Sequence, residues 1–315
     1  MANFQKVPND KTTRLDAGVG RLVLMLEETA MIDLYGGGPG GEDLVVDFND
    51  PMMGTVSEGP VKRNGPLQTY QIQGLKSGNA MLEARLFNQT PADSQGRRQL
   101  WFSMPVWASL QVSVLGAEYR QAGGTWGSLA YGSTNPRWKH VHWTNMAEAG
   151  CGPTSLSIII DFLDRLDSPD RYVPASFPGV DPKDTMAYTS RYGRAADDKG
   201  EPSGTSGPVM IANISKYWPD YEGEKVKNVD EATDWLRAGS PLVFLCRKCT
   251  TYKYDNKGNK VEKNWGGHFM VVLGVENDEE TFWITDPSLA HHKYISRQEL
   301  AKTDIWHIYK KKQGA

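Results

Sequence analysis

The chain has 315 residues, which is enough for two domains of ordinary size. Its 39% hydrophobic and 23% charged residues are typical of a soluble globular protein, and a net charge of −3 gives no reason to expect a nucleic acid or an anionic membrane as a partner. No segment has the roughly 18 apolar residues of a membrane span, and the polar start lacks the apolar run of a secretory signal. We therefore expect synthesis in the cytoplasm, with any secretion by a non-classical, contact-dependent route.

The first third of the chain has the pattern of a β-rich domain. Residues 1–18 are polar and predict a flexible arm. Beyond them, short runs rich in Val, Leu, Tyr and Phe alternate with turn clusters, which is typical of strands joined by tight turns. The predicted strands are Arg21–Leu26, Leu44–Phe48, Leu67–Ile72, Met81–Phe87 and Ser109–Leu115. We predict a β-sandwich over residues 19–117. The text GLKSGNAMLEARL, followed by ASLQVSVLG, resembles the last strands of bacterial immunoglobulin-like domains.

Residues 118–140 are rich in Gly, Ser and aromatic residues without periodicity, and they predict a linker that packs partly on the second domain. From residue 141 onward the pattern changes to helices followed by strands. The predicted helices are Pro153–Leu166, Pro208–Trp218, Asp230–Ala238 and a short one from Ser296, and the predicted strands are Pro241–Cys246, His268–Val275, Thr281–Asp286 and Ile305–Lys310. Helices that precede an antiparallel sheet indicate an α+β domain over residues 141–315.

Cys151 is the strongest candidate for a reactive group. It lies between two glycines, just before Pro153 and an apolar helix. A thiol at a helix N-terminus feels the positive end of the helix dipole and free backbone N–H groups, and both favour the thiolate. The alternative is a structural cysteine, but buried cysteines lie more often within strands or helices than between glycines at a helix start.

Two further candidates lie at strand ends. His268 begins an apolar strand after a pair of glycines, where a neutral imidazole can accept the thiol proton; the alternative is an edge histidine bonded to the backbone. Asp286 ends a later strand in front of a proline, a position that alone suggests a turn. If the two strands are antiparallel, the start of one lies beside the end of the other, so the carboxylate can orient the imidazole.

Asn145 lies six residues before Cys151. An amide donor there, together with the Cys151 backbone N–H, can stabilise a tetrahedral oxyanion, although an asparagine in a loop is usually a turn residue.

The order of a Gly-Cys-Gly-Pro helix start, the segment GGHFMVVLGV and a strand that ends in Asp-Pro resembles the papain-like clan of cysteine peptidases. It most resembles the bacteriocin-processing, double-glycine type, over about residues 140–310. The resemblance implies a Cys-bearing helix packed on an antiparallel sheet and a triad of Cys151, His268 and Asp286. That family usually has Gln where this chain has the shorter Asn145. It also implies small residues, above all Gly-Gly, before the scissile bond, so cleavage of the chain's own Gly123-Gly124 is conceivable.

We expect no cofactor and no metal. Cys246 and Cys249 form a single CxxC without a second pair or nearby histidines, which is a poor zinc site, and a redox pair prefers a helix start to the end of a strand. His291 and His292 are adjacent on an extended segment and point to opposite faces. Because the chain has three cysteines, this pair lying close together would leave Cys151 as a lone thiol.

Three hypotheses of function follow. The first is a cysteine peptidase that acts on a protein or peptide. The second keeps the fold but makes the substrate peptidoglycan, with amidase or endopeptidase activity. The third is a binding protein with a degenerate peptidase domain. A bacterial toxin or effector delivered into competitor cells would fit the first, with an immunity protein or a component of the secretion machine as a partner; a cytosolic maturation protease fits equally.

Overall fold

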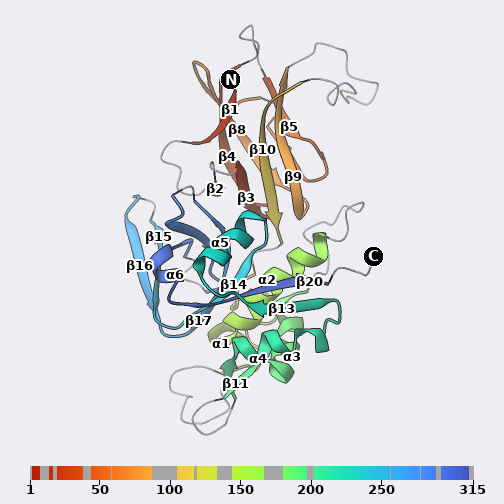
Figure 1. Cartoon of the computed structure of the whole chain (residues 1–315), viewed down its shortest axis with the longest axis vertical. Coiled ribbons are helices and arrows are strands. Elements are labelled where there is room, and N and C mark those ends of the chain that lie inside the picture. Colours follow the sequence, from red (N-terminus) through yellow and green to blue (C-terminus); the bar gives the residue numbers. More distant parts are fainter. Residues whose placement is uncertain are drawn as a thin grey trace. The chain divides into compact units, whose positions relative to one another are not determined.

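The computed structural model of the chain describes residues 2–7, 14–16, 20–37, 44–57, 59–86, 105–116, 119–132, 144–166, 180–196, 202–255, 257–276, 278–288 and 292–311 (Figure 1). The chain forms two compact units: Met1–Leu115 with Asp170–Ser176, here unit 1, and Gly116–Pro169 with Phe177–Ala315, here unit 2. No helix within the described ranges is both long enough and apolar enough to cross a membrane.

Unit 1 is a β-sandwich. One sheet has the strand order β1-β4-β8-β6, with β7 also paired to β8, and the other has the order β2-β3-β10-β9-β5. The strands are β1 Asn3–Lys6, β2 Arg14–Asp16, β3 Arg21–Met25, β4 Thr29–Tyr35, β5 Leu44–Phe48, β6 Gly54–Val56, β7 Lys62–Asn64, β8 Leu67–Gly74, β9 Gly78–Leu86 and β10 Val106–Leu115. Ile32 and Ile72 of the first sheet share one apolar core with Leu22 and Val112 of the second. Burial of the two inner faces against each other is what holds a sandwich together.

Several strands of unit 1 were not apparent in the sequence. Residues 1–18, predicted as an arm, contribute β1, which pairs with β4, and β2, which pairs with β3. In β1, Phe4 is the one apolar residue and is partly buried against the core, so a single apolar position gives no alternation to reveal the strand. β4 carries an acid in mid-strand, Asp33, which is buried and accepts a hydrogen bond of 2.5 Å from the Thr69 hydroxyl.

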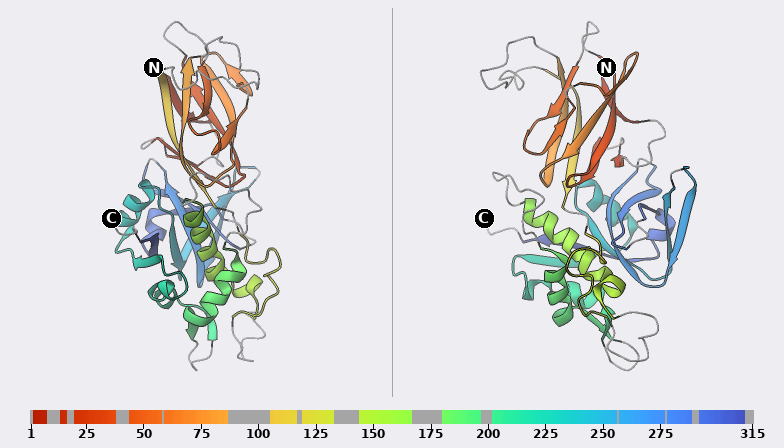
Figure 2. Two further views of the ribbon diagram at one scale, coloured as in Figure 1. Left: turned by 90° about the vertical axis from the view of Figure 1, so that its right-hand side faces the viewer. Right: turned by 180° about the vertical axis from the view of Figure 1, so that it is seen from behind.

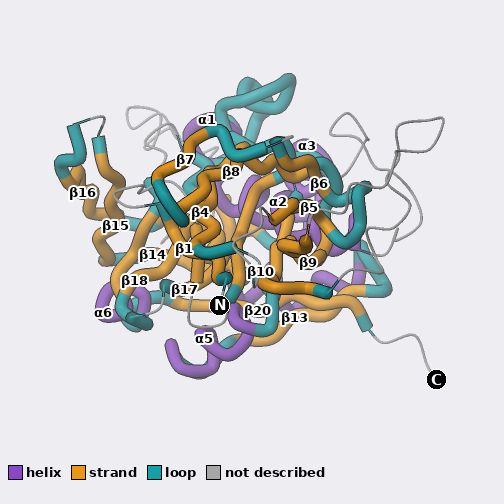
Figure 3. Tube along the Cα trace, turned by 90° about the horizontal axis from the view of Figure 1, so that it is seen from above, coloured by secondary structure: helices purple, strands orange, loops and turns teal. Residues whose placement is uncertain are grey.

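Unit 2 is built on an eight-stranded sheet with the order β13-β20-β14-β17-β18-β19-β15-β16, in which each neighbouring pair is antiparallel. Its strands are β13 Tyr221–Lys225, β14 Leu242–Cys246, β15 Cys249–Tyr254, β16 Lys260–Trp265, β17 His268–Val275, β18 Thr281–Thr285, β19 Tyr294–Ser296 and β20 Asp304–Lys310. A separate small hairpin joins β11 Arg194–Ala196 to β12 Pro202–Thr205. Figure 3 shows the β15–β16 hairpin at one end of the large sheet.

Unit 2 has six helices within the part of the chain that the structure describes. They are α1 Met146–Ala149, α2 Cys151–Leu166, α3 Pro182–Tyr192, α4 Gly207–Ala212, α5 Val229–Arg237 and α6 Arg297–Leu300, with a 3-10 turn at Ile214–Lys216. Both α2 and α5 pack on β17, whose eight residues are all buried. The right-hand view of Figure 2 shows α2 crossing in front of the sheet strands. A helix-bearing antiparallel sheet that follows a β-sandwich along the chain confirms the predicted α+β fold class.

Candidate active site

Cys151 is the first residue of α2 and follows α1 after a single residue, Gly150. Its thiol is free and partly exposed. The sulfur accepts hydrogen bonds from the backbone N–H groups of Gly152 and Phe269, so both α2 and β17 contribute donors to it. A Cβ on Gly152 would lie 2.4 Å from Thr205 Oγ1, so a glycine is required where the start of α2 meets β12.

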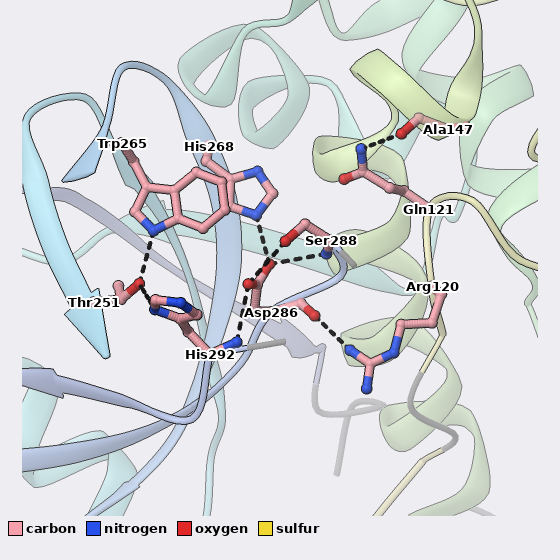
Figure 4. Close-up of polar contacts among 9 residues, drawn as sticks. All are labelled: Arg120, Gln121, Ala147, Thr251, Trp265, His268, Asp286, Ser288 and His292. Atoms are coloured by element: carbon pink, nitrogen blue, oxygen red, sulfur yellow. Dashed lines mark hydrogen bonds and ion pairs between the residues drawn. The ribbon is translucent and has the colours of Figure 1, made fainter. Parts of the chain in front are cut away.

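His268 is the first residue of β17 and is 5% exposed. Its Nε2 lies 2.7 Å from Asp286 Oδ1 (Figure 4). Its side chain also hydrogen-bonds to the Cys151 thiol. Because Nε2 contacts the carboxylate, Nδ1 is the nitrogen left to face the sulfur. β17 and β18 are antiparallel, with Val271 opposite Thr285, and this register places the start of one strand near the end of the other, as the sequence predicted.

Asp286 directly follows β18 and its carboxylate is fully saturated by donors. Oδ1 accepts from His268 Nε2 and, at 2.8 Å, from the Ser288 N–H. Oδ2 accepts from the Ser288 hydroxyl at 2.9 Å and from the His292 N–H at 3.1 Å. Four donors around a buried carboxylate fix its orientation and stabilise its charge.

The protonation states of these three groups depend on one another. Burial by itself raises the pKa of the Cys151 thiol, but the hydrogen bond and the charge of His268 bring that pKa below its ordinary value. Burial by itself lowers the pKa of His268, but Asp286 and Cys151 raise it to about 9. Burial also opposes ionisation of Asp286, yet His268, His292 and Ser288 hold its pKa well below the usual range. The arrangement therefore favours a thiolate beside an imidazolium and a carboxylate.

Comparison with known proteins identifies the family of the chain. The model of the family described as "Peptidase_C39 like family" matches residues 136–313, more than half of the chain. The chain belongs to this family. It is therefore a cysteine peptidase of papain-like type, and the prediction of an enzyme of this class is confirmed.

Two solved structures are also similar to the chain. Xylellain, a cysteine protease from Xylella fastidiosa, is 14% identical, with 58% of this chain and 83% of that chain covered and a TM-score of 0.31. The surface layer protein SbsC, domains 1–6, is 9% identical, with 88% of this chain and 24% of that chain covered and a TM-score of 0.22. Neither TM-score is high enough to support an argument. The search of curated proteins gave no match.

In this C39-like peptidase, Asn145 caps α1. Its Oδ1 accepts a hydrogen bond of 3.1 Å from the Glu148 N–H, which leaves the two amide N–H donors of the side chain outside the cap. Capping explains an asparagine at the start of α1 without any chemistry. The same residue lies one short helix before Cys151, so the structure leaves a second role for its Nδ2 open to test.

Arg120 and Gln121 contact the site although the sequence did not mark them. Arg120 Nη1 donates to the backbone oxygen of Asp286 at 2.5 Å, and the Gln121 N–H donates to that of Pro287 at 2.9 Å. Gln121 Nε2 donates to the backbone oxygen of Ala147 at 2.6 Å (Figure 4). These two residues, which we call the strap, join the end of β18 to the helix that precedes Cys151. The aperiodic stretch 118–140 offers no pattern that would have revealed them.

Cys246 and Cys249 form a disulfide between the end of β14 and the start of β15. Cys246 lies opposite His268 in the β14–β17 pair, and Cys249 lies opposite Trp265 in the β15–β16 pair. The disulfide therefore crosslinks β14 and β15 beside the site and leaves Cys151 as the free thiol, as the close spacing of Cys246 and Cys249 suggested. Among the described residues, no cluster of His, Cys, Asp and Glu could hold a metal ion.

Proposed function

We propose that Cys151, His268 and Asp286 are the catalytic triad of this peptidase. The observation that carries the proposal is the hydrogen-bonded series from the Cys151 thiol through His268 to Asp286. The thiolate attacks the substrate carbonyl carbon, and the His268 imidazolium gives its proton to the leaving amine as the C–N bond breaks. His268 then takes a proton from water, which attacks the thioester and releases the sulfur as thiolate. Asp286 keeps the imidazole oriented throughout.

The oxyanion of each tetrahedral intermediate needs donors near Cys151. The Cys151 backbone N–H at the start of α2 is one candidate, and Asn145 Nδ2 is the other. Support for Asn145 is its place just before α1 and the two amide N–H groups that its capping hydrogen bond does not use. Asn145→Ala would lose both the cap and the donor, whereas Asn145→Asp keeps the capping oxygen alone. An activity loss shared by both variants would support the oxyanion role, and full activity of Asn145→Asp would exclude it.

The disulfide makes the test of the triad direct, because Cys151 is the one thiol open to alkylation without reductant. We would label the wild type, Cys151→Ala and His268→Ala with iodoacetamide across pH and follow intact mass. We expect fast labelling of the wild type below pH ~7, none in Cys151→Ala and slow labelling in His268→Ala. Labelling with a midpoint near the ordinary thiol value of roughly 8.5, unaffected by His268→Ala, would refute the triad.

For the substrate we propose a protein or peptide with small residues, preferably Gly-Gly, before the scissile bond. Support comes from the Gly-Cys-Gly-Pro and Gly-Gly-His motifs and from an Asp, rather than a second His, as the third residue. Matched peptides with Gly-Gly or Leu-Leu before the same bond would test the preference. Loss of turbidity from isolated cell walls, with no peptide cleavage, would instead favour the peptidoglycan hypothesis.

We further propose that the enzyme acts as an effector in competitor cells, with unit 1 as a docking module and an immunity protein as its inhibitor. Support comes from the arrangement of a separate β-sandwich unit before a peptidase unit. Expression of the wild type and Cys151→Ala in bacterial hosts, directed to the cytoplasm or the periplasm, would test it. Growth inhibition that requires Cys151 supports this role, and equal growth in all cases favours a maturation protease.

A further inference from the structure

The imidazole of His268 is held on its face as well as at its edge. The indole of Trp265, at the end of β16, stacks on it with ring centroids 4.0 Å apart and an interplanar angle of 15°. Asp286 fixes the Nε2 edge of the His268 ring, but one hydrogen bond still allows the ring to turn about the line of that bond. The stacked indole restricts that rotation, so the position of Trp265 sets the plane in which His268 meets Cys151.

Trp265 is in turn fixed by a buried polar connection that leads back to Asp286. Its Nε1 donates to Thr251 Oγ1 at 2.7 Å, and that oxygen lies 2.8 Å from His292 Nδ1. The His292 backbone N–H donates to Asp286 Oδ2 at 3.1 Å. The contacts form a closed loop, Asp286 to His268 to Trp265 to Thr251 to His292 and back to Asp286 (Figure 4).

In this loop Thr251 joins Trp265 to His292. It lies in mid-strand of β15 and is fully buried. A buried hydroxyl there is not needed to fill space, because valine has nearly the same shape. It hydrogen-bonds to both the indole N–H and the His292 ring nitrogen, and a buried polar group without a partner is costly. His292 is also buried, and burial lowers its pKa despite the nearby Asp286 carboxylate, with Lys253 and Lys263 adding to the effect. It therefore serves as a neutral hydrogen-bonding group.

We propose that Thr251 and His292 are positioning residues that hold Trp265 and Asp286, and through them the imidazole of His268, in the geometry that activates Cys151. The inference rests on the proposed function, since it concerns the same triad. Neither residue needs to touch the substrate. Loss of the Thr251 hydroxyl removes the anchor of the indole while all three triad residues remain present.

The test compares Thr251→Val with Thr251→Ser, which restores the hydroxyl, and with Thr233→Val as a matched control. Thr233 is likewise buried, and its hydroxyl donates to the Val229 backbone oxygen within α5 at 2.8 Å, outside the loop. For each protein we would measure the pH profile of Cys151 alkylation by intact mass and the melting temperature. We expect Thr251→Val to slow labelling at neutral pH by roughly fivefold and to move its midpoint toward the ordinary thiol value. Thr251→Ser should restore the wild-type profile, and Thr233→Val should lower the melting temperature with the profile unchanged.

Two outcomes overturn the inference. One is a wild-type profile in Thr251→Val alongside a melting temperature that falls as in Thr233→Val, because Thr251 would then be structural only. If Thr251→Val does not fold, Trp265→Phe keeps a ring but loses the N–H, and a wild-type profile in that variant also overturns the inference. These results are distinct from failure of the triad itself, which would show as ordinary thiol behaviour in the wild type.

Discussion

Replacing Asp286 with Asn tests the electrostatic side of the site with little change in shape. The carboxylate accepts four hydrogen bonds, from His268, the Ser288 N–H, the Ser288 hydroxyl and the His292 N–H. An amide has a single acceptor oxygen, so in either orientation its NH₂ group meets at least one N–H donor. If the oxygen faces His268, the donor left without an acceptor is the His292 N–H; if the NH₂ faces His268, the imidazole is pushed toward the wrong tautomer.

The expected magnitude follows from the lost charge. A hydrogen bond to a charged group stabilises by about 1.5–3 kcal/mol and one between neutral groups by about 1 kcal/mol. The imidazolium of His268 therefore loses roughly 0.5–2 kcal/mol, which corresponds to a roughly two- to thirtyfold smaller population of the thiolate–imidazolium pair. The pKa of His268, raised to about 9 in the wild type, falls, and that of Cys151 rises toward its ordinary value.

The assay is alkylation of Cys151 as a function of pH. Asp286→Asn should label more slowly than the wild type near neutral pH, and the two rates should converge above pH 9, where the wild-type imidazolium also loses its proton. Asp304→Asn is the matched control, because Asp304 lies in the same unit and its carboxylate pairs with Lys225 and Arg247 instead of with a triad residue. Coinciding profiles for Asp286→Asn and Asp304→Asn across the whole range would refute this account of the site.

Three further predictions concern the surroundings of the triad. Gly152→Ala brings a Cβ within 2.4 Å of Thr205 Oγ1, so it should displace the start of α2 and lower the free energy of unfolding by about 1–3 kcal/mol. An unchanged urea midpoint and an unchanged alkylation rate of Cys151 would contradict this. Cys246→Ala/Cys249→Ala removes a short closed loop and should lower the free energy of unfolding by roughly 2 kcal/mol, as reductant should in the wild type; equal stability with and without the disulfide would show that it does not constrain the unfolded chain. The wild type should keep its full mass during incubation, because Gly124, at φ +54°, lies in a tight turn against Trp126 rather than in the extended form of a bound peptide; a fragment cut after Gly124 would disprove this.

The elements that could be predicted are those whose own sequence shows either burial in the core or a helix start. β17 reads as an unbroken apolar run and is buried along its whole length. α5 begins where Asn228 caps it, and α6 begins at Ser296 with Glu299 in its first turn, so both helices have local start signals. α3 was missed although Asp181 and Asp184 form a capping box, because few apolar residues lie on its buried face and the polar Thr185 and Thr189 take their place.

The candidate site shows the same division. Cys151, His268 and Asp286 each lie at the end of an element, between or beside glycine or proline, and such positions can be recognised without a structure. Thr251 is one threonine in a strand of ordinary composition, and its importance arises from Trp265 and from His292, which approaches from a distant part of the chain. A side chain that hydrogen-bonds to two residues far away in the sequence cannot be recognised from the residues next to it.

The strap changes how the catalytic half can be separated from the rest of the chain. Arg120 and Gln121 precede the residues 136–313 that the family model covers, yet they hydrogen-bond to the backbone of Asp286, Pro287 and Ala147. A fragment limited to the residues that the family model covers would therefore keep every residue of the triad but lose the hydrogen bonds that the strap makes beside it. One begun at Gly116 would retain that support, so the loss of function on shortening the chain need not mean that unit 1 takes part in catalysis.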